Sequence, residues 1–480
     1  MAAQDRHDVY VNPLISRYAG SEMAALFSDD HKFGLWRRLW LALAEAEAEL
    51  GLDISPAQLE ELRAHLDDID YEQAALWERE LRHDVMAHIQ AWGRQCPLAR
   101  PIIHLGATSA YVVDNGDLIR LREGLALLRR RLLTVIAALA DFAREWQGLA
   151  CLAYTHFQPA QPTTVGKRAC LWLNDLLMDL ERLEHEMRSL PLLGCKGATG
   201  TGASFLELFG GDGAKVRALE EKIGAKLGFD RCCPVSGQTY SRKLDYNVLS
   251  VLSGVAQSAA KFANDVRLLC HLGEVSEPFG RRQVGSSAMA YKRNPMRCER
   301  MDSLSRFIIA DAANPAYTAA TQWLERTLDD SANKRISLPE AFLACDGVLA
   351  LYADVARGLT VYPLVIARHL REELPFMATE NMLMRAVAQG RDRQDAHEAI
   401  REQSQASREA MRLEGADNDL LQRLARDERL GLDAAQLEQV LAESDFTGLA
   451  VQQTEDFLRQ YVSPLLAANA VEPVSFEIEV

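Results

Sequence analysis

The sequence predicts an all-α fold built on long helices that lie nearly parallel or antiparallel to one another. In the clearest helical segment, apolar residues recur at alternating steps of three and four: Leu118, Leu121, Leu125, Leu128, Leu132, Val135, Leu139 and Phe142. This heptad pattern keeps one apolar stripe facing a neighbouring helix. Long helical patterns also cover about 166–190, 243–274 and 338–358. No stretch alternates with period two over the length of a strand, although short strands in the connections stay open. Helices this long need apolar neighbours, so we expect a bundle in an oligomer.

The residues before this segment predict shorter helices with clear start signals. Ser28 and Asp29 open a helix that ends at Gly51. Ser55-Pro56, followed by Gln58, supplies an N-cap, a first-turn proline and a capping-box partner for the next helix.

The segment RHDVMAH, from Arg82 to His88, lies near another predicted helix start. Its histidines, His83 and His88, are five residues apart, which is the wrong spacing for two metal ligands on one helical face. The segment is either a plain helix-surface cluster or a contribution to a site. The following HLGATSAYVVDN is expected to be a loop that exposes hydrogen-bond donors at Thr108 and Ser109.

Three polar connections lie between the long helices. In THFQPAQPTT the prolines exclude a continuing helix, so we expect His156 on irregular backbone at a helix end. The run LGCKGATGTGASF is neither a Walker loop nor a dinucleotide fingerprint, so a flexible connection is favoured over a nucleotide cradle. SGQTYSRK, from Ser236 to Lys243, is a polar loop that enters a helix.

The segment GRRQVGSSAMAYKRNPMRCER, from Gly280 to Arg300, has no apolar periodicity and carries the densest chemistry in the chain. Adjacent hydroxyls at Ser286 and Ser287 precede a run of cations and an amide. Loops held on rigid helices are common places for catalytic groups, and a solvated helix connection is the alternative.

The last chemistry-bearing segment is LERTLDDSANKR. Arg326, Ser331 and Arg335 suit a phosphate or a carboxylate, unless Asp329 and Asp330 simply pair with the arginines. The bundle pattern ends near Pro363. Shorter helices with starts near Thr379 and Asp392 follow, with turns at Gly415 and Gly448, and predict a small C-terminal helical domain.

Composition limits the class of protein. The chain has 480 residues, 48% hydrophobic and 25% charged, with a formal net charge of −15. This acidity argues against nucleic acid or an anionic membrane as a partner. Nine cysteines without C-x-x-C spacing indicate free thiols in a reducing compartment. The N-terminus has no leader pattern and no apolar run reaches membrane length, so a cytoplasmic location is expected.

The loop GSSAMAYKRNP resembles the signature of the fumarase/aspartase superfamily, G-S-S-x-M-P-x-K-x-N-P, with Ala290 in place of the family proline. This departure removes no proposed catalytic side chain. RHDVMAH, HLGATS, THFQPAQPTT, SGQTYSRK, LERTLDDSAN, ELPFMATEN and RQDAHE are similar to the animal form of one branch, the adenylosuccinate lyase family. The resemblance therefore covers nearly the whole chain.

The resemblance implies an architecture and a reaction. It implies three helical domains, at 1–111, 112–364 and 365–480, in a homotetramer whose active sites each take residues from three subunits. The reaction is β-elimination of fumarate from adenylosuccinate, which gives AMP, and from the carboxamide ribotide SAICAR, which gives AICAR, in purine biosynthesis. This is acid–base chemistry, so no metal or organic cofactor is implied.

The resemblance also implies roles for particular residues. Ser286 would be the general base and His156 the general acid, with Lys292 stabilising charge and Glu299 orienting the histidine. The substrate would be bound by Arg17, Tyr18, Arg82, His83, Asp84, Thr108, Ser109, Gln238, Asn294, Arg300, Arg326, Ser331 and Arg335. Two alternatives remain at this point: a superfamily relative acting on another succinyl-type substrate, and a non-catalytic structural homologue.

Overall fold

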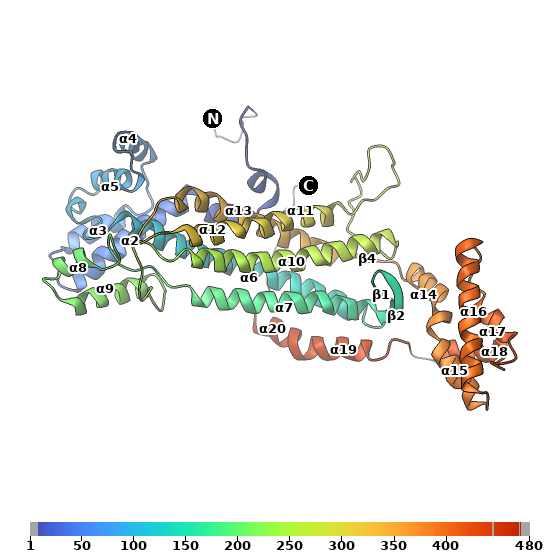
Figure 1. The fold of residues 1–480 in the computed structure, drawn as a ribbon. Helices are drawn as coiled ribbons and strands as arrows, with labels where there is room; N and C mark the ends of the chain where they lie inside the picture. Colours follow the sequence, from blue (N-terminus) through green and yellow to red (C-terminus); the bar gives the residue numbers. More distant parts are fainter. Residues whose placement is uncertain (1–7, 444–445, 470, 472–480) are drawn as a thin grey trace.

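The computed structural model describes residues 8–443, 446–469 and 471, and it confirms the all-α prediction. The long helices lie side by side in an elongated bundle (Figure 1). They are α6 (Ser109–Glu145), α7 (Val165–Ser189), α10 (Lys243–His271), α11 (Met296–Asp311) and α13 (Asp330–Gly358).

The predicted heptad seam of α6 is the centre of the bundle core. Every residue of the seam is buried, and it packs with α7 and α13. Aromatic rings join the other helices: Phe262 of α10 stacks on Tyr352 of α13 with centroids 4.2 Å apart and meets Trp172 of α7 edge-on. Each such buried side chain contributes about 2–3 kcal/mol through removal of apolar surface from water. Apolar packing therefore holds the helices of the bundle together.

Close helix packing depends on Gly124. A Cβ at this position would lie 2.6 Å from a ring atom of Phe342, so α6 and α13 approach here only because the residue has no side chain. The seam therefore specifies which face of α6 is buried, and Gly124 beside it sets how closely α6 and α13 approach.

The start of α6 differs from the prediction. The helix begins at Ser109, whereas the sequence analysis extended the preceding loop to Asn115. Polar residues interrupt the apolar spacing here, so the helix was not predicted. Asp114 and Asn115 are nevertheless buried and form hydrogen bonds or ion pairs. The Asn115 amide donates to the carbonyls of Tyr111 and Gly194 at 2.8 and 3.2 Å, which explains a polar residue inside a buried turn.

Shorter helices precede α6. The predicted caps are confirmed: Ser28 accepts from the backbone of His31, and Ser55 and Gln58 form a reciprocal capping box. The elements are η2 (Leu14–Tyr18), α1 (Ser21–Leu26), α2 (Asp29–Glu49), α3 (Pro56–Ala64), α4 (Tyr71–Leu81), α5 (Asp84–Gln95) and η3 (Arg100–Ile102).

Short elements connect the long helices. An antiparallel hairpin of β1 (Ala150–Thr155) and β2 (Gln158–Thr164) joins α6 to α7, and β3 (Val275–Ser276) pairs with β4 (Thr360–Val361). Prolines in β2 are tolerated because a two-stranded sheet leaves half of its backbone N–H groups unpaired. The remaining helices here are α8 (Ala203–Leu208), α9 (Gly213–Lys226) and α12 (Ala313–Thr321).

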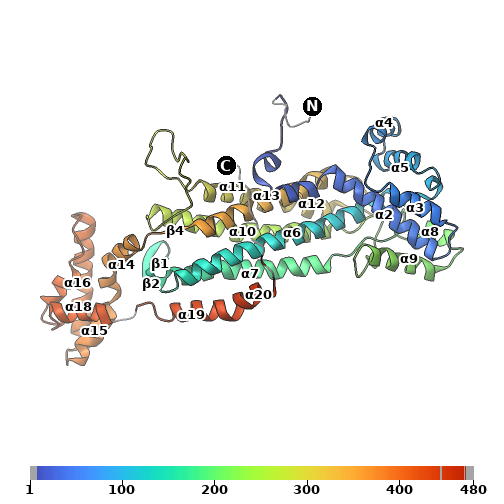
Figure 2. The same ribbon diagram turned by 180° about the vertical axis from the view of Figure 1, so that it is seen from behind.

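After the bundle, a separate apolar cluster holds the next helices together, and then the chain returns to the bundle. The cluster is formed by α14 (Pro363–Met377), α15 (Thr379–Ala388), α16 (Arg393–Leu413), α17 (Leu420–Ala425) and α18 (Ala434–Glu443). The last elements, α19 (Ala450–Phe457), η4 (Leu458–Val462) and α20 (Ser463–Ala468), lie along the bundle (Figure 2). There α19 packs on α7, and Leu458 and Val462 join the bundle core.

Helix α13 contains a longer apolar stretch than the sequence analysis predicted. Its 29 residues, Asp330–Gly358, are long and apolar enough to cross a membrane, although the sequence analysis found no run of that length. In the structure 83% of the apolar window is buried among the other helices. The hydrophobicity of α13 therefore serves the core of the bundle.

Candidate functional site

A buried ion-pair network ties three segments together at the start of α13. Arg242 reaches both oxygens of Asp114 on α6, at 3.0 and 3.2 Å, and its Nε lies 2.6 Å from Asp330 of α13. Lys334 adds contacts to Asp114 at 3.4 Å and to Asp117 at 2.7 Å. All five side chains are buried, and their opposite charges and hydrogen bonds offset the cost of removing them from water.

Predicted substrate-binding residues surround this network. Asp330 also accepts from Arg326, so that arginine is held by a carboxylate, as the sequence analysis allowed. His83, the N-cap of α5, lies 3.3 Å from the hydroxyl of Ser109. Arg335 lies 3.4 Å from Asp84. These contacts bring together residues that are separated by up to 251 positions in the sequence.

Gln238 is fixed in the same region by the glycine-rich run. Its backbone N–H donates to the carbonyl of Glu325 and its side-chain amide to that of Ala198. Gly200, with a φ of +83°, leaves no room for a Cβ because Ser236 O would lie 1.9 Å away. The run is thus a packing surface, which corrects the expectation of a flexible connection. We name as the α13-start cluster the residues Arg82, His83, Asp84, Thr108, Ser109, Gln238, Arg326, Ser331 and Arg335.

The segment before α11 folds back on itself. Ser286 Oγ accepts from the backbone N–H of Met289 at 3.1 Å, and the Asn294 amide donates to Gly285 O at 2.8 Å. Lys292 N donates to Met289 O at 3.0 Å. These bonds curl the predicted catalytic loop around the half-buried Ser286.

The loop leads into the first turn of α11, where Glu299 and Arg300 lie. Arg300 Cζ is 6.0 Å from the ring centre of Tyr18, and Arg300 Nη1 is buried without a hydrogen-bond partner among the described residues. Tyr18 ends η2, which also carries Arg17 and packs on α13. We name as the α11-start cluster the residues of this loop, of the start of α11 and of the end of η2: Arg17, Tyr18, Ser286, Lys292, Asn294, Glu299 and Arg300.

His156 lies by itself, at the tip of the β1–β2 hairpin. His156 and Phe157 are the two central residues of a two-residue hairpin turn. Their φ values of 53° and 56° are left-handed, as is usual for both central residues of such a turn. The prediction of irregular backbone at a helix end is therefore wrong, because His156 lies in the turn between two paired strands. The imidazole is exposed, and no hydrogen bond joins it to Glu299 in the part of the chain that the structure describes.

Within one chain the α13-start cluster is far from both the α11-start cluster and His156. Tyr18 packs against Gly347, and at 1.5 Å per residue that position lies roughly 24 Å along α13 from Ser331. Ser109 begins α6, whose 37 residues extend about 55 Å before the hairpin follows. In Figure 1 the hairpin and the α5–α6 junction are at opposite ends of the bundle. One copy of the chain therefore does not bring a complete predicted site together.

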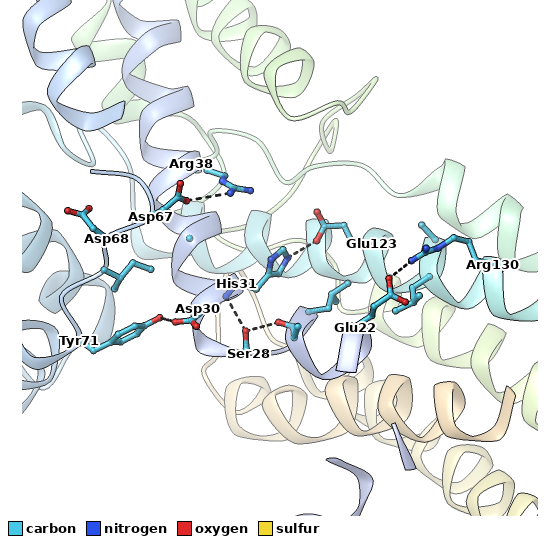
Figure 3. A pocket seen from close by; sticks show the side chains of 16 residues that line it. Glu22, Ser28, Asp30, His31, Arg38, Asp67, Asp68, Tyr71, Glu123 and Arg130 are labelled. Atoms are coloured by element: carbon cyan, nitrogen blue, oxygen red, sulfur yellow. Dashed lines mark hydrogen bonds and ion pairs between the residues drawn. The ribbon is translucent and has the colours of Figure 1, made fainter. Parts of the chain in front are cut away.

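A spacious cleft lies elsewhere, between the N-terminal helices and α6 (Figure 3). It encloses about 1200 Å³, and its charged side chains pair with one another: His31 with Glu123 at 2.7 Å, and Arg38 with Asp67 at 3.6 Å. None of the predicted catalytic residues lines it. Because its charges are already neutralised, it offers little unsatisfied chemistry to a ligand.

Comparisons with known proteins match nearly the whole length of the chain. A family model described as "Lyase" matches residues 21–309, and one described as "Adenylosuccinate lyase C-terminus" matches residues 375–457. The chain is 49% identical over 470 residues to the adenylosuccinate lyase of Saccharomyces cerevisiae, covering 97% of this chain and 96% of that one. The enzyme of Schizosaccharomyces pombe is 48% identical over 461 residues, covering 95% and 96%.

The fold has solved relatives as well. The crystal structure of 3-carboxy-cis,cis-muconate lactonizing enzyme from Pseudomonas putida superimposes with a TM-score of 0.80 at 24% identity, covering 93% of this chain and 98% of that one. At this identity the similarity concerns the fold alone.

Proposed function

The chain belongs to the adenylosuccinate lyase family of the fumarase/aspartase superfamily, and from this premise we propose how its residues act. It is a carbon–nitrogen lyase that eliminates fumarate from adenylosuccinate to give AMP. By the same chemistry it converts SAICAR to AICAR. The observation that carries this function is the near-full-length identity to adenylosuccinate lyases, together with a loop that presents Ser286 to a backbone donor.

The difficult step is removal of a proton from the carbon beside a carboxylate, because the carbanion must be stabilised as it forms. Ser286 is the proposed base. A hydroxyl is a weak base in water, and the N–H of Met289 at 3.1 Å favours its ionised form. The ammonium of Lys292, in the same loop, would add positive charge near both the serine and the substrate carboxylates, with Asn294 as a further donor.

His156 is the proposed general acid, which protonates the leaving nitrogen. Its exposed position on a hairpin tip suits a residue that enters the site of another copy of the chain. Glu299, exposed in the first turn of α11, would then orient a histidine that arrives from a neighbouring subunit.

Substrate binding is divided between the two clusters. In the α13-start cluster, hydroxyls and arginines would hold the nucleotide, and Ser331 and Arg335 would contact its phosphate. In the α11-start cluster, the buried unpaired Nη1 of Arg300 is a donor that a ligand anion would satisfy. Arg17 and Tyr18 would approach the phosphate from another subunit.

Assembly into a homotetramer would bring these parts together, since within one chain the α13-start cluster is separated from His156 and from the α11-start cluster. The central helices also expose apolar side chains that other copies would cover: Leu171, Met178, Leu268, Phe307, Ile309 and Tyr317. We propose that each active site takes residues from three subunits. The proposed partners are therefore small-molecule substrates and copies of this chain, in the cytoplasm, without a metal or cofactor.

The test is an absorbance assay of the purified protein with adenylosuccinate, run beside Ser286→Ala. We expect AMP and fumarate to appear with the wild type, and turnover to fall by about 10² or more in the variant while substrate still binds. A folded wild-type tetramer that leaves adenylosuccinate intact would contradict the function. Near-normal turnover by Ser286→Ala would contradict the role of the serine alone.

A further inference from the structure

A small cavity beside Ser331 and Arg335 contains a lysine that the sequence analysis did not single out. The cavity encloses about 250 Å³ between the starts of α2 and α13 and the first third of α6. Its wall includes Lys32 of α2 and Arg120 of α6, together with Lys334. Four cations thus line one space, and one of them, Arg335, is a proposed phosphate contact together with Ser331.

Three of the four cations are neutralised by carboxylates. Lys334 lies 2.7 Å from Asp117, which also pairs with Arg120. Arg335 has Asp84 at 3.4 Å. These carboxylates balance part of the positive charge on the three cations.

Lys32 differs because it makes no ion pair with any residue that the structure describes. Its ammonium instead lies over the rings of Phe33 and Trp36, 4.5 and 5.1 Å from the centroids. Such contacts stabilise a cation weakly and leave its hydrogen-bond donors available. Burial lowers the pKa of Lys32, and Arg120 and Arg335 lower it further, against the opposite effects of Asp84 and Asp29. An anion in the cavity would relieve this cost.

We propose that Lys32 is a further phosphate-binding residue of the nucleotide site, acting with Ser331 and Arg335. The ligand class is a phosphate monoester dianion, which accepts from an ammonium, an arginine fork and a hydroxyl at once. This inference rests on the proposed function and deepens it. Lys32 contributes to discrimination between a nucleotide and the corresponding nucleoside.

The test compares AMP with adenosine as ligands of the intact tetramer, by calorimetry or by inhibition of turnover. Lys32→Met keeps the stem and removes the charge, and should weaken AMP binding about ten-fold or more without changing adenosine binding. Lys32→Arg should retain most of the AMP affinity. The matched control is Lys215→Met on α9, since its ammonium also lies near a ring, Phe209, and it does not line the cavity.

Two results would overturn the proposal: unchanged AMP affinity in Lys32→Met, or equal losses for AMP and adenosine, which would indicate general damage. A wild type that binds neither ligand would also overturn it. AMP binding does not require turnover. A protein that binds AMP through Lys32 and leaves adenylosuccinate intact would therefore contradict the proposed function and leave the phosphate site standing.

Discussion

Arg242 and Asp114 form a buried, two-pronged ion pair, with Nη1 3.0 Å from Oδ2 and Nη2 3.2 Å from Oδ1. They lie 128 positions apart in the sequence, and each side chain is at most 2% exposed. The pair fixes α6 to the segment that carries Gln238. Through Asp330, it also fixes both to α13.

Removing this guanidinium should therefore be costly. We expect Arg242→Met to lower the free energy of unfolding by about 3–5 kcal/mol, because two buried carboxylates would lose the guanidinium that bridges them. Arg242→Lys keeps the charge without the fork and should recover only part of the loss. Urea unfolding measures both. The control is Arg130→Met, which breaks an exposed pair with Glu22 and should cost about 0–1 kcal/mol. Equal losses in the two methionine variants would contradict the assignment.

Glu47 should make stability depend on pH. The side chain is completely buried, neither carboxylate oxygen has a hydrogen-bond partner among the described residues, and burial raises the pKa to about 8. Between the ordinary glutamate pKa and about 8, the unfolded chain releases a proton that the folded chain keeps. The stability contributed by Glu47 is thus fully present in acid and lost as the pH rises to about 8.

Glu47→Gln should remove this dependence. Relative to wild type, its free energy of unfolding should rise between pH 6 and pH 8, by roughly 1.4 kcal/mol per pH unit at most. The control is Glu49→Gln, because ion pairs with Lys222 and Lys226 lower the pKa of Glu49 to about 2. Its difference from wild type should be constant over that range. A constant difference for Glu47→Gln as well would disprove the buried, protonated carboxyl.

Gly285 should be essential to the shape of the serine loop. A Cβ there would lie 2.2 Å from the backbone oxygen of Lys292, which cannot move without opening the loop. We expect Gly285→Ala to reduce kcat by about 10² through misplacement of Ser286, with global unfolding nearly unchanged. Gly280→Ala is the matched control, because its nearest neighbour, Gln283 Cβ, would be 3.6 Å away. Comparable kcat values for the two variants would show that the loop tolerates the change.

The main helices could be predicted from the sequence because their apolar spacing records directly which faces are buried. The seam from Leu118 to Phe142 is the clearest case. The true start of α6 could not be predicted in this way. Asp114 and Asn115 are polar, and they are buried because residues far away in the sequence pair with them. An apolar pattern contains no information on such partners.

The sequence indicated which residues make up the predicted site, but not how they are arranged in space. The hairpin at His156 escaped detection because a His-Phe pair occupies a turn for which Asn-Gly is the usual signal. Lys32 escaped because a lysine in a first helical turn resembles any solvated lysine. The separation of His156 from the α13-start cluster follows from the length of α6, which residue types alone do not reveal.

The central claim is that one active site combines residues of different copies of the chain. The most direct test mixes the purified His156→Ala protein with the purified Ser286→Ala protein, each expected to be inactive alone, and confirms subunit exchange by native mass spectrometry. Random exchange should restore about a quarter of wild-type activity, because each contributing residue is intact in about half of the subunits. Absence of recovery after confirmed exchange would mean that His156 and Ser286 of the same chain serve the same site, and would contradict the shared-site arrangement.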